Sequence, residues 1–133
     1  MSTISMVLAF LLLGSLLLGG LQQQLDSRFG RAANESAAIK AFNASLSAQA
    51  LAQYRLWQFT PQWQCQLLPE VGGRACVRQT ETHVLVASQG MQENVMPITL
   101  WRWAQADGET LRFIPRGWSD FCPLAEIKQC QLP

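Results

Sequence analysis

The four cysteines are the residues of this sequence best suited to covalent chemistry, and all of them lie beyond the first proline, Pro61. An even number of cysteines outside an apolar N-terminus suggests disulfides in an oxidising compartment, and four cysteines allow three pairings. We prefer the two local pairs, Cys65–Cys76 and Cys122–Cys130, with free thiols as the alternative. No C-x-x-C spacing is present, which argues against a redox site or a zinc ribbon. If the disulfides form, the domain is extracytoplasmic and the N-terminus faces the cytoplasm.

Little else in the sequence could support catalysis or a metal site. The only histidine, His83, lies in an expected strand without a ligand-type neighbour. Ser119 and Asp120 are adjacent, but no oriented histidine or oxyanion motif accompanies them. We therefore expect a protein that is not an enzyme, without catalytic residues, metal or cofactor. The net charge of +1 gives no electrostatic reason to expect direct binding of nucleic acid.

The elements that must position the cysteines begin with an uncharged N-terminus. Charged residues make up 14% of the chain, and none occurs before Asp26. The stretch from Ile4 to Leu21 is interrupted only by serines and glycines, and about 20 apolar residues cross a bilayer as a helix. We expect residues 1–25 to be a retained transmembrane helix. A cleaved signal peptide and a buried core helix are the alternatives. Small residues that allow a neighbouring helix to approach closely are Gly14, Ser15, Gly19 and Gly20.

The helix is expected to continue beyond the membrane. Between Leu21 and Trp57 the chain has no proline and a single glycine, and its composition is helix-forming. Apolar residues at helical spacing form one stripe, which comprises Phe29, Ala32, Ile39, Phe42, Leu46, Ala50, Tyr54 and Trp57. Residues 26–58 are therefore predicted to be an amphipathic continuation of the same helix. Its contact with the following domain is predicted to bury Ile39, Phe42, Leu46 and Trp57.

Residues 59–133 are predicted to form a small β domain. Alternating segments rich in β-branched and aromatic residues predict strands at 75–80, 83–88, 98–104 and 110–114. Asp107-Gly108 favours a two-residue hairpin turn, which would place Trp103 opposite Arg112 as a cation–π pair. The predicted fold class is α+β: a long N-terminal helix packed on an antiparallel sheet of three or four strands and stapled by disulfides.

This pattern resembles a type IV pilin, and more narrowly the enterobacterial YgdB-like minor pilins. The resemblance is carried by the apolar N-terminal stretch 6–18 and by the more specific tail, Pro115–Leu124 with Cys130–Pro133. Cys65 and Cys76 also lie where such proteins place cysteines.

The resemblance implies a prepilin peptidase-dependent minor pilin, held in the inner membrane by residues 1–25 with a periplasmic C-terminal domain. It implies that the protein joins other minor pilins, the major pilin and the pilus assembly machinery. The resulting tip complex would prime pilus assembly and remain at the pilus tip.

Two features depart from the pilin pattern. Pilin precursors carry a short basic leader that ends in glycine, and this pattern is not seen before the apolar stretch. In such a family, Met1 would therefore either replace the first mature residue or be the initiator. Most pilins have glutamate at the fifth mature position, where this chain has Ser5. A carboxylate in hydrocarbon costs at least about 2.5 kcal/mol unless it is paired. Because a first subunit has no predecessor whose N-terminal amine would be its partner, Ser5 favours a position at the tip.

Two alternatives stay open from the sequence. A type II secretion minor pseudopilin shares this architecture and tolerates loss of the glutamate, although the tail favours the pilus. A stand-alone, membrane-anchored periplasmic binding module would use Trp101, Trp103 and Trp118 as its ligand surface. In the competing interpretation these tryptophans belong to the core.

Overall fold

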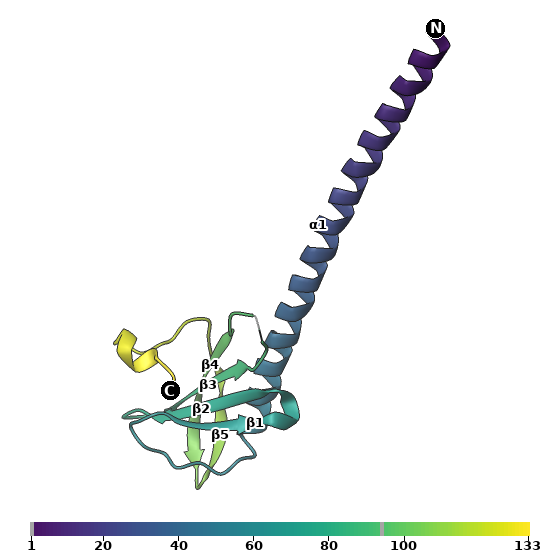
Figure 1. The fold of residues 1–133 in the computed structure, drawn as a ribbon. Coiled ribbons are helices and arrows are strands. Elements are labelled where there is room, and N and C mark those ends of the chain that lie inside the picture. Colours follow the sequence, from purple (N-terminus) through teal and green to yellow (C-terminus); the bar gives the residue numbers. More distant parts are fainter. Residues whose placement is uncertain (1, 94) are drawn as a thin grey trace. The chain divides into compact units, whose positions relative to one another are not determined.

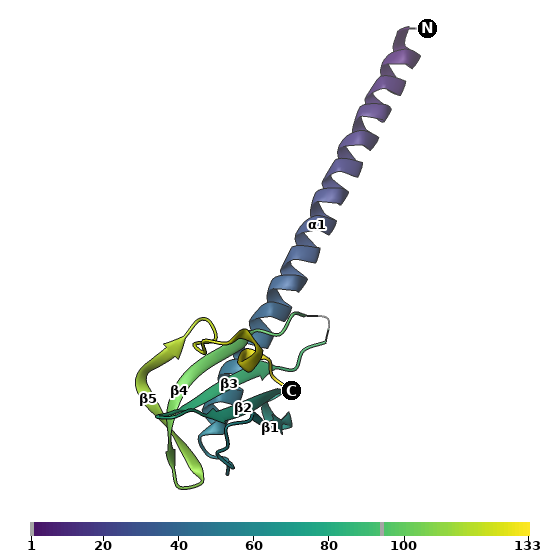
Figure 2. The ribbon, with the colours of Figure 1, turned by 90° about the vertical axis from the view of Figure 1, so that its left-hand side faces the viewer.

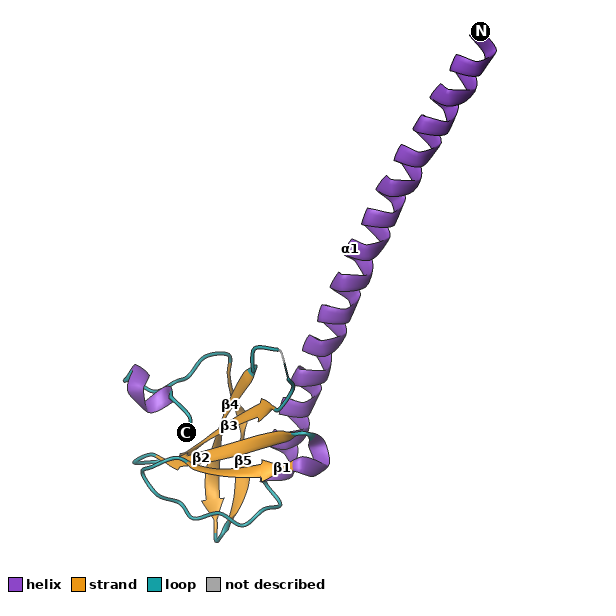
Figure 3. Cartoon of the chain, viewed as in Figure 1, coloured by secondary structure: helices purple, strands orange, loops and turns teal. Residues whose placement is uncertain are grey.

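The computed structural model describes residues 2–93 and 95–133 (Figure 1). Its elements confirm the predicted α+β class and are arranged as one long helix followed by an antiparallel sheet (Figure 3). In chain order they are α1 (Ser2–Ala52), β1 (Gln64–Leu68), η1 (Pro69–Val71), β2 (Gly73–Gln79), β3 (Val84–Gly90), β4 (Thr99–Asp107), β5 (Thr110–Ser119) and η2 (Ile127–Cys130). The chain divides after Ser36 into two compact units, which are described separately.

The sheet is a five-stranded meander in which every strand pairs with the next one in the sequence. Both predicted disulfides are present. Cys65 and Cys76 are direct partners across β1 and β2, with Cα atoms 4.0 Å apart. Cys122 and Cys130 close a loop in the C-terminal segment, with Cα atoms 5.9 Å apart. The disulfides therefore fix one edge of the sheet and the tail.

The sheet has more strands than the three or four predicted. β1 was not predicted because its sequence, QCQLL, contains none of the β-branched or aromatic residues by which the other strands were predicted, although its first four residues alternate between polar and apolar. β5 continues through Pro115 as far as Ser119, beyond the predicted end at Ile114. Because β5 is an edge strand, a proline that lacks an N–H donor is tolerated there.

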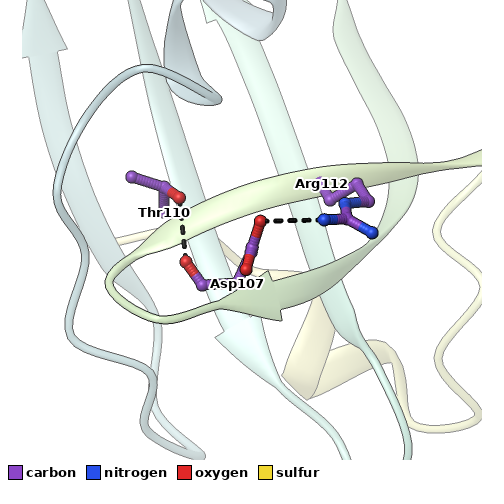
Figure 4. Close-up of polar contacts among 3 residues, drawn as sticks. All are labelled: Asp107, Thr110 and Arg112. Carbon is purple, nitrogen blue, oxygen red and sulfur yellow. Dashed lines mark hydrogen bonds and ion pairs between the residues drawn. The ribbon is translucent and has the colours of Figure 1, made fainter.

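The hairpin between β4 and β5 is displaced from the predicted register. The prediction that Trp103 faces Arg112 is wrong, because Asp107 pairs with Thr110 and the turn is centred one residue later. Gly108 is the first central residue and has a φ of +65°, as a type II′ turn requires. Figure 4 shows the contacts that close the turn: Thr110 Oγ1 donates to the Asp107 carbonyl (2.9 Å), and Arg112 Nη2 lies 3.1 Å from Asp107 Oδ2.

α1 ends at Ala52 rather than at residue 58. The next amides, of Tyr54 and Arg55, bond only three residues back, to Leu51 and Ala52. The indole Nε1 of Trp57 also donates to the Ala52 carbonyl, at 2.8 Å. This carbonyl therefore accepts two hydrogen bonds where the helix ends, one from the Arg55 amide and one from the indole.

The sheet is covered on both faces within residues 37–133 (Figures 1 and 2). One core cluster lies between the sheet and the last turns of α1, and includes Ala48, Ala52, Trp57 and Leu68. The other lies under the C-terminal segment, where Leu124 and Leu132 pack against the cluster that contains Leu85 and Trp101. The domain therefore has three layers: helix, sheet and tail.

The helix face in contact with the sheet differs from the predicted stripe. Trp57 is buried and Leu46 is half-buried, but Ile39 and Phe42 are 59% and 42% exposed. The buried face consists of small side chains and one glutamine: Ala41, Ala44, Ser45, Ala48, Gln49 and Ala52.

The physical reason for the small face is the close approach of α1 to β2 and β3. A Cβ built on Gly90 would lie 2.5 Å from the Ala41 carbonyl oxygen, and one on Gly73 would lie 3.0 Å from Ala48 Cβ. No bulky residue fits between backbones this close, so Ile39 and Phe42 face outward.

Candidate functional site

The N-terminal part of α1 contains a stretch that is long and apolar enough to cross a membrane. Its 18-residue window has a mean hydropathy of 2.4 and is not buried anywhere in the structure. Large apolar side chains are exposed all around this stretch, including Phe10, Leu13 and Leu16. A helix of such composition needs lipid or other apolar helices around it, since water solvates these side chains poorly.

The serines of this stretch have satisfied hydroxyl groups. Ser5 Oγ donates to the Ser2 carbonyl at 3.0 Å, and Ser15 Oγ donates to the Leu12 carbonyl at 2.9 Å. Because these donors are paired within their own helix, neither hydroxyl requires an external partner in an apolar environment.

The other small residues lie on the outside of the helix with free space beside them. A Cβ built on Gly14, Gly19 or Gly20 would meet no heavy atom of the chain within 4 Å. At 3.6 residues per turn, Ser5, Ser15 and Gly19 share an arc of about 80°, and Gly14 lies on the opposite side. The helix therefore gathers part of the predicted packing set on one face.

Ser45 links α1 to the sheet, a role that sequence reasoning missed. Its Oγ is fully buried and accepts a hydrogen bond from the Gly90 amide at 2.8 Å. It lies 2.9 Å from the Ala41 carbonyl oxygen and 3.0 Å from that of Ile98, to either of which it can donate. One hydroxyl thus connects the helix to the end of β3 and to the segment before β4.

Two hydrogen bonds connect the C-terminal segment to β2 and to the residues before β1. Trp63 Nε1 donates to the Gln129 carbonyl at 2.6 Å, and Arg74 Nη1 donates to the Pro133 carbonyl at 2.6 Å.

A family model described as "Protein of unknown function (DUF2509)" matches residues 9–130, and so includes most of α1, the whole sheet and both disulfides. The chain belongs to the DUF2509 family. Comparison with curated proteins and with solved structures gave no match.

The tryptophans of this DUF2509 chain do not share one surface. Trp101 is buried under the tail, and Trp103 is half-buried on the same face. Trp118 is 49% exposed and stacks instead on Arg102, whose Cζ lies 4.8 Å from the ring centroid. Phe113 stacks on the same guanidinium at 4.4 Å and packs against the helix-side cluster. The ligand surface that would join Trp101, Trp103 and Trp118 is therefore divided between two faces of the sheet.

In the part of the chain that the structure describes, Glu70 and Arg102 have a shifted pKa. The pKa of Glu70 is held below its ordinary value of 4.5 by a backbone hydrogen bond and then by the Arg55 side chain, with which it forms an ion pair. Burial lowers the pKa of the Arg102 guanidinium. His83 Nδ1 lies 2.8 Å from Thr82 Oγ1. Among the residues that the structure describes, no group of three or more histidines, cysteines or carboxylates could hold a metal ion.

Proposed function

We propose that this DUF2509 protein is a minor subunit of a type IV pilus that joins other minor pilins in a tip complex and primes assembly. The observation that carries the proposal is the double use of α1. Its N-terminal part is apolar on all sides, and its last turns pack on a disulfide-bonded antiparallel sheet. The tail from Pro115 to Leu124 supports a YgdB-like minor pilin in particular.

The apolar segment fits a subunit that changes its surroundings. In the inner membrane, lipid covers the exposed side chains of residues 2–25. In a filament, the corresponding helices of neighbouring subunits would cover the same surface, and the free energy of burial would be similar in both places. Ser15 and Gly19, which share one face, would allow a neighbouring helix to approach closely.

Ser5 supports a position at the tip. Serine is uncharged and its hydroxyl donates to the Ser2 carbonyl, so position 5 needs no partner from an earlier subunit. We expect Ser5→Glu to reduce recovery of the tip complex, because the carboxylate would have no amine partner. Recovery equal to that of the wild type, measured by co-purification of the minor pilins, would remove the argument for tip placement.

The proposal is tested with an epitope-tagged full chain in its native host. The chain should fractionate with the inner membrane and with sheared pili, and it should co-purify with other pilins. Deletion of residues 2–25 should abolish all three. Gly19→Leu should weaken co-purification, whereas the same change at Gly30, outside the apolar segment and equally free of contacts, should not.

The identity of the partners separates the candidates. Partners from a type II secretion system would indicate a pseudopilin, which has the same architecture. A chain recovered alone, trimmed near Gly20 and freely soluble, would contradict both assignments. A binding module would keep its ligand after the deletion, but the division of its tryptophans between two faces makes it the weaker candidate.

A further inference from the structure

A second site lies on β4 and β5 and is centred on an unpaired arginine. The Arg102 guanidinium is stacked between Phe113 and Trp118, with its Cζ 4.4 and 4.8 Å from the two ring centroids. Arginine carries five N–H donors, yet none of the described residues forms a hydrogen bond or an ion pair with it. Its Nε is buried without an acceptor. An external acceptor cannot reach this buried nitrogen, so a ligand would bind through the terminal Nη1 and Nη2 groups, which are not among the buried atoms.

The backbone around Trp118 is built to place this ring on Arg102. The two residues are direct partners across β4 and β5, at a break in the register between Arg102 and Ala104. Arg116 has a φ of +61°, a left-handed conformation that is strained for a residue with a side chain. A Cβ on Gly117 would lie only 3.0 Å from the Trp103 carbonyl oxygen. Bulges that re-aim a side chain occur often beside functional sites.

The surroundings of the guanidinium favour an anionic partner. Burial removes part of the water around the cation, which lowers its pKa. For the same reason the cation gains more from a nearby opposite charge. Asp120 lies two residues beyond Trp118 and is exposed, but it makes no ion pair with Arg102. Trp118 is 49% exposed and extends the site with an apolar surface beside the charge.

We propose that Arg102, Phe113 and Trp118 form a binding site for a carboxylate. A single guanidinium neutralises one negative charge, and its planar fork matches both oxygens of a carboxylate. The flanking rings hold the fork in place and contact the atoms that carry the carboxylate. The site itself does not rest on the proposed role in a pilus, but one of the two sources of the carboxylate, a neighbouring subunit, does. The carboxylate can belong to an acidic side chain of a neighbouring subunit or to a free organic acid.

The site is tested by titrating the nitrogen-15-labelled full chain, in a non-ionic detergent, with sodium acetate at constant ionic strength. The Arg102 Nε–H and Trp118 indole N–H resonances should shift and saturate with acetate, but not with acetamide or sodium chloride. Arg102→Lys keeps the charge but lacks the fork, and should weaken acetate binding about tenfold. Arg112→Lys, on the same hairpin but already paired with Asp107, should bind acetate as the wild type does.

Unchanged spectra elsewhere in the domain show that the variants remain folded. An equal response to chloride and acetate, or undiminished acetate binding by Arg102→Lys, would overturn the proposal. A pull-down with the same variant then identifies the source of the carboxylate. Loss of a co-purified protein indicates an acidic side chain of a neighbouring subunit, whereas retention of every co-purified protein indicates a free acid.

Discussion

Gly90→Ala tests the close contact between α1 and the sheet. The new methyl group would lie 2.5 Å from the Ala41 carbonyl oxygen and 3.1 Å from both Ala41 Cα and Ala44 Cβ. The first two of these atoms belong to the helix backbone, so a change of rotamer cannot relieve the overlap. The helix must move away from the end of β3.

The cost can be estimated from the structure. Overpacking of a tight core costs about 1–3 kcal/mol. Movement of the helix also loses the 2.8 Å hydrogen bond from the Gly90 amide to Ser45, worth about 1 kcal/mol. Replacing a strand glycine returns about 0.5–1 kcal/mol through chain entropy. We expect a net loss of about 1–3.5 kcal/mol, which lowers the unfolding temperature by roughly 5–25 °C in a domain of this size.

The assay is thermal and urea unfolding of the full chain in non-ionic detergent, followed by near-ultraviolet circular dichroism. Gly30→Ala is the matched control. Its Cβ meets nothing within 4 Å, so it should leave stability unchanged or raise it by up to about 1 kcal/mol. Ala44→Gly should not rescue Gly90→Ala, because the backbone overlap would persist. A loss below about 0.5 kcal/mol, or full rescue by Ala44→Gly, would refute the close-contact argument.

Three further expectations concern stability. Ser45→Ala should lower the free energy of unfolding by about 1–3 kcal/mol, since a buried amide loses its acceptor; an unchanged urea midpoint would contradict this. The pKa of Glu70 is lowered, so its contribution is present above pH 4.5 and is lost as the pH falls below that value. In Glu70→Gln or Arg55→Ala, the free energy of unfolding should therefore decrease less than in the wild type as the pH falls below 4.5, which urea unfolding at a series of pH values measures. Replacing Cys65 and Cys76 together by alanine should cost about 3 kcal/mol, measured against the oxidised wild type by urea unfolding.

The fold class was predicted correctly from the change from helical to alternating hydropathy along the chain. The preferred disulfide pairs were also correct, although the sequence left three pairings open. The face of α1 that contacts the sheet could not be predicted in the same way. Hydropathy selects bulky residues such as Ile39 and Phe42, whereas the close approach at Gly90 admits only small side chains. Small residues at helical spacing, from Ala41 to Ala52, together with the strand glycines Gly73 and Gly90, were the signal that could have identified this face.

The register between β4 and β5 was the other feature that the sequence did not predict. Asp107-Gly108 correctly indicated a hairpin. The position of Gly108 within the turn decides which residues of β4 and β5 face each other, and it lies one place earlier in the turn than predicted. The predicted pair of Trp103 with Arg112 was therefore wrong. The stacking of Arg102 depends on a bulge and on the left-handed Arg116, and neither has a dependable signature in a single sequence.

The consecutive pairing of all five strands bears on how the domain acquires its structure. Neighbouring hairpins close short loops, and such local contacts form faster than pairings between distant segments. The sheet can thus assemble progressively along the chain, from β1 to β5. Only the last step, closure of the loop between Cys122 and Cys130, must wait until the C-terminal end of the chain is available.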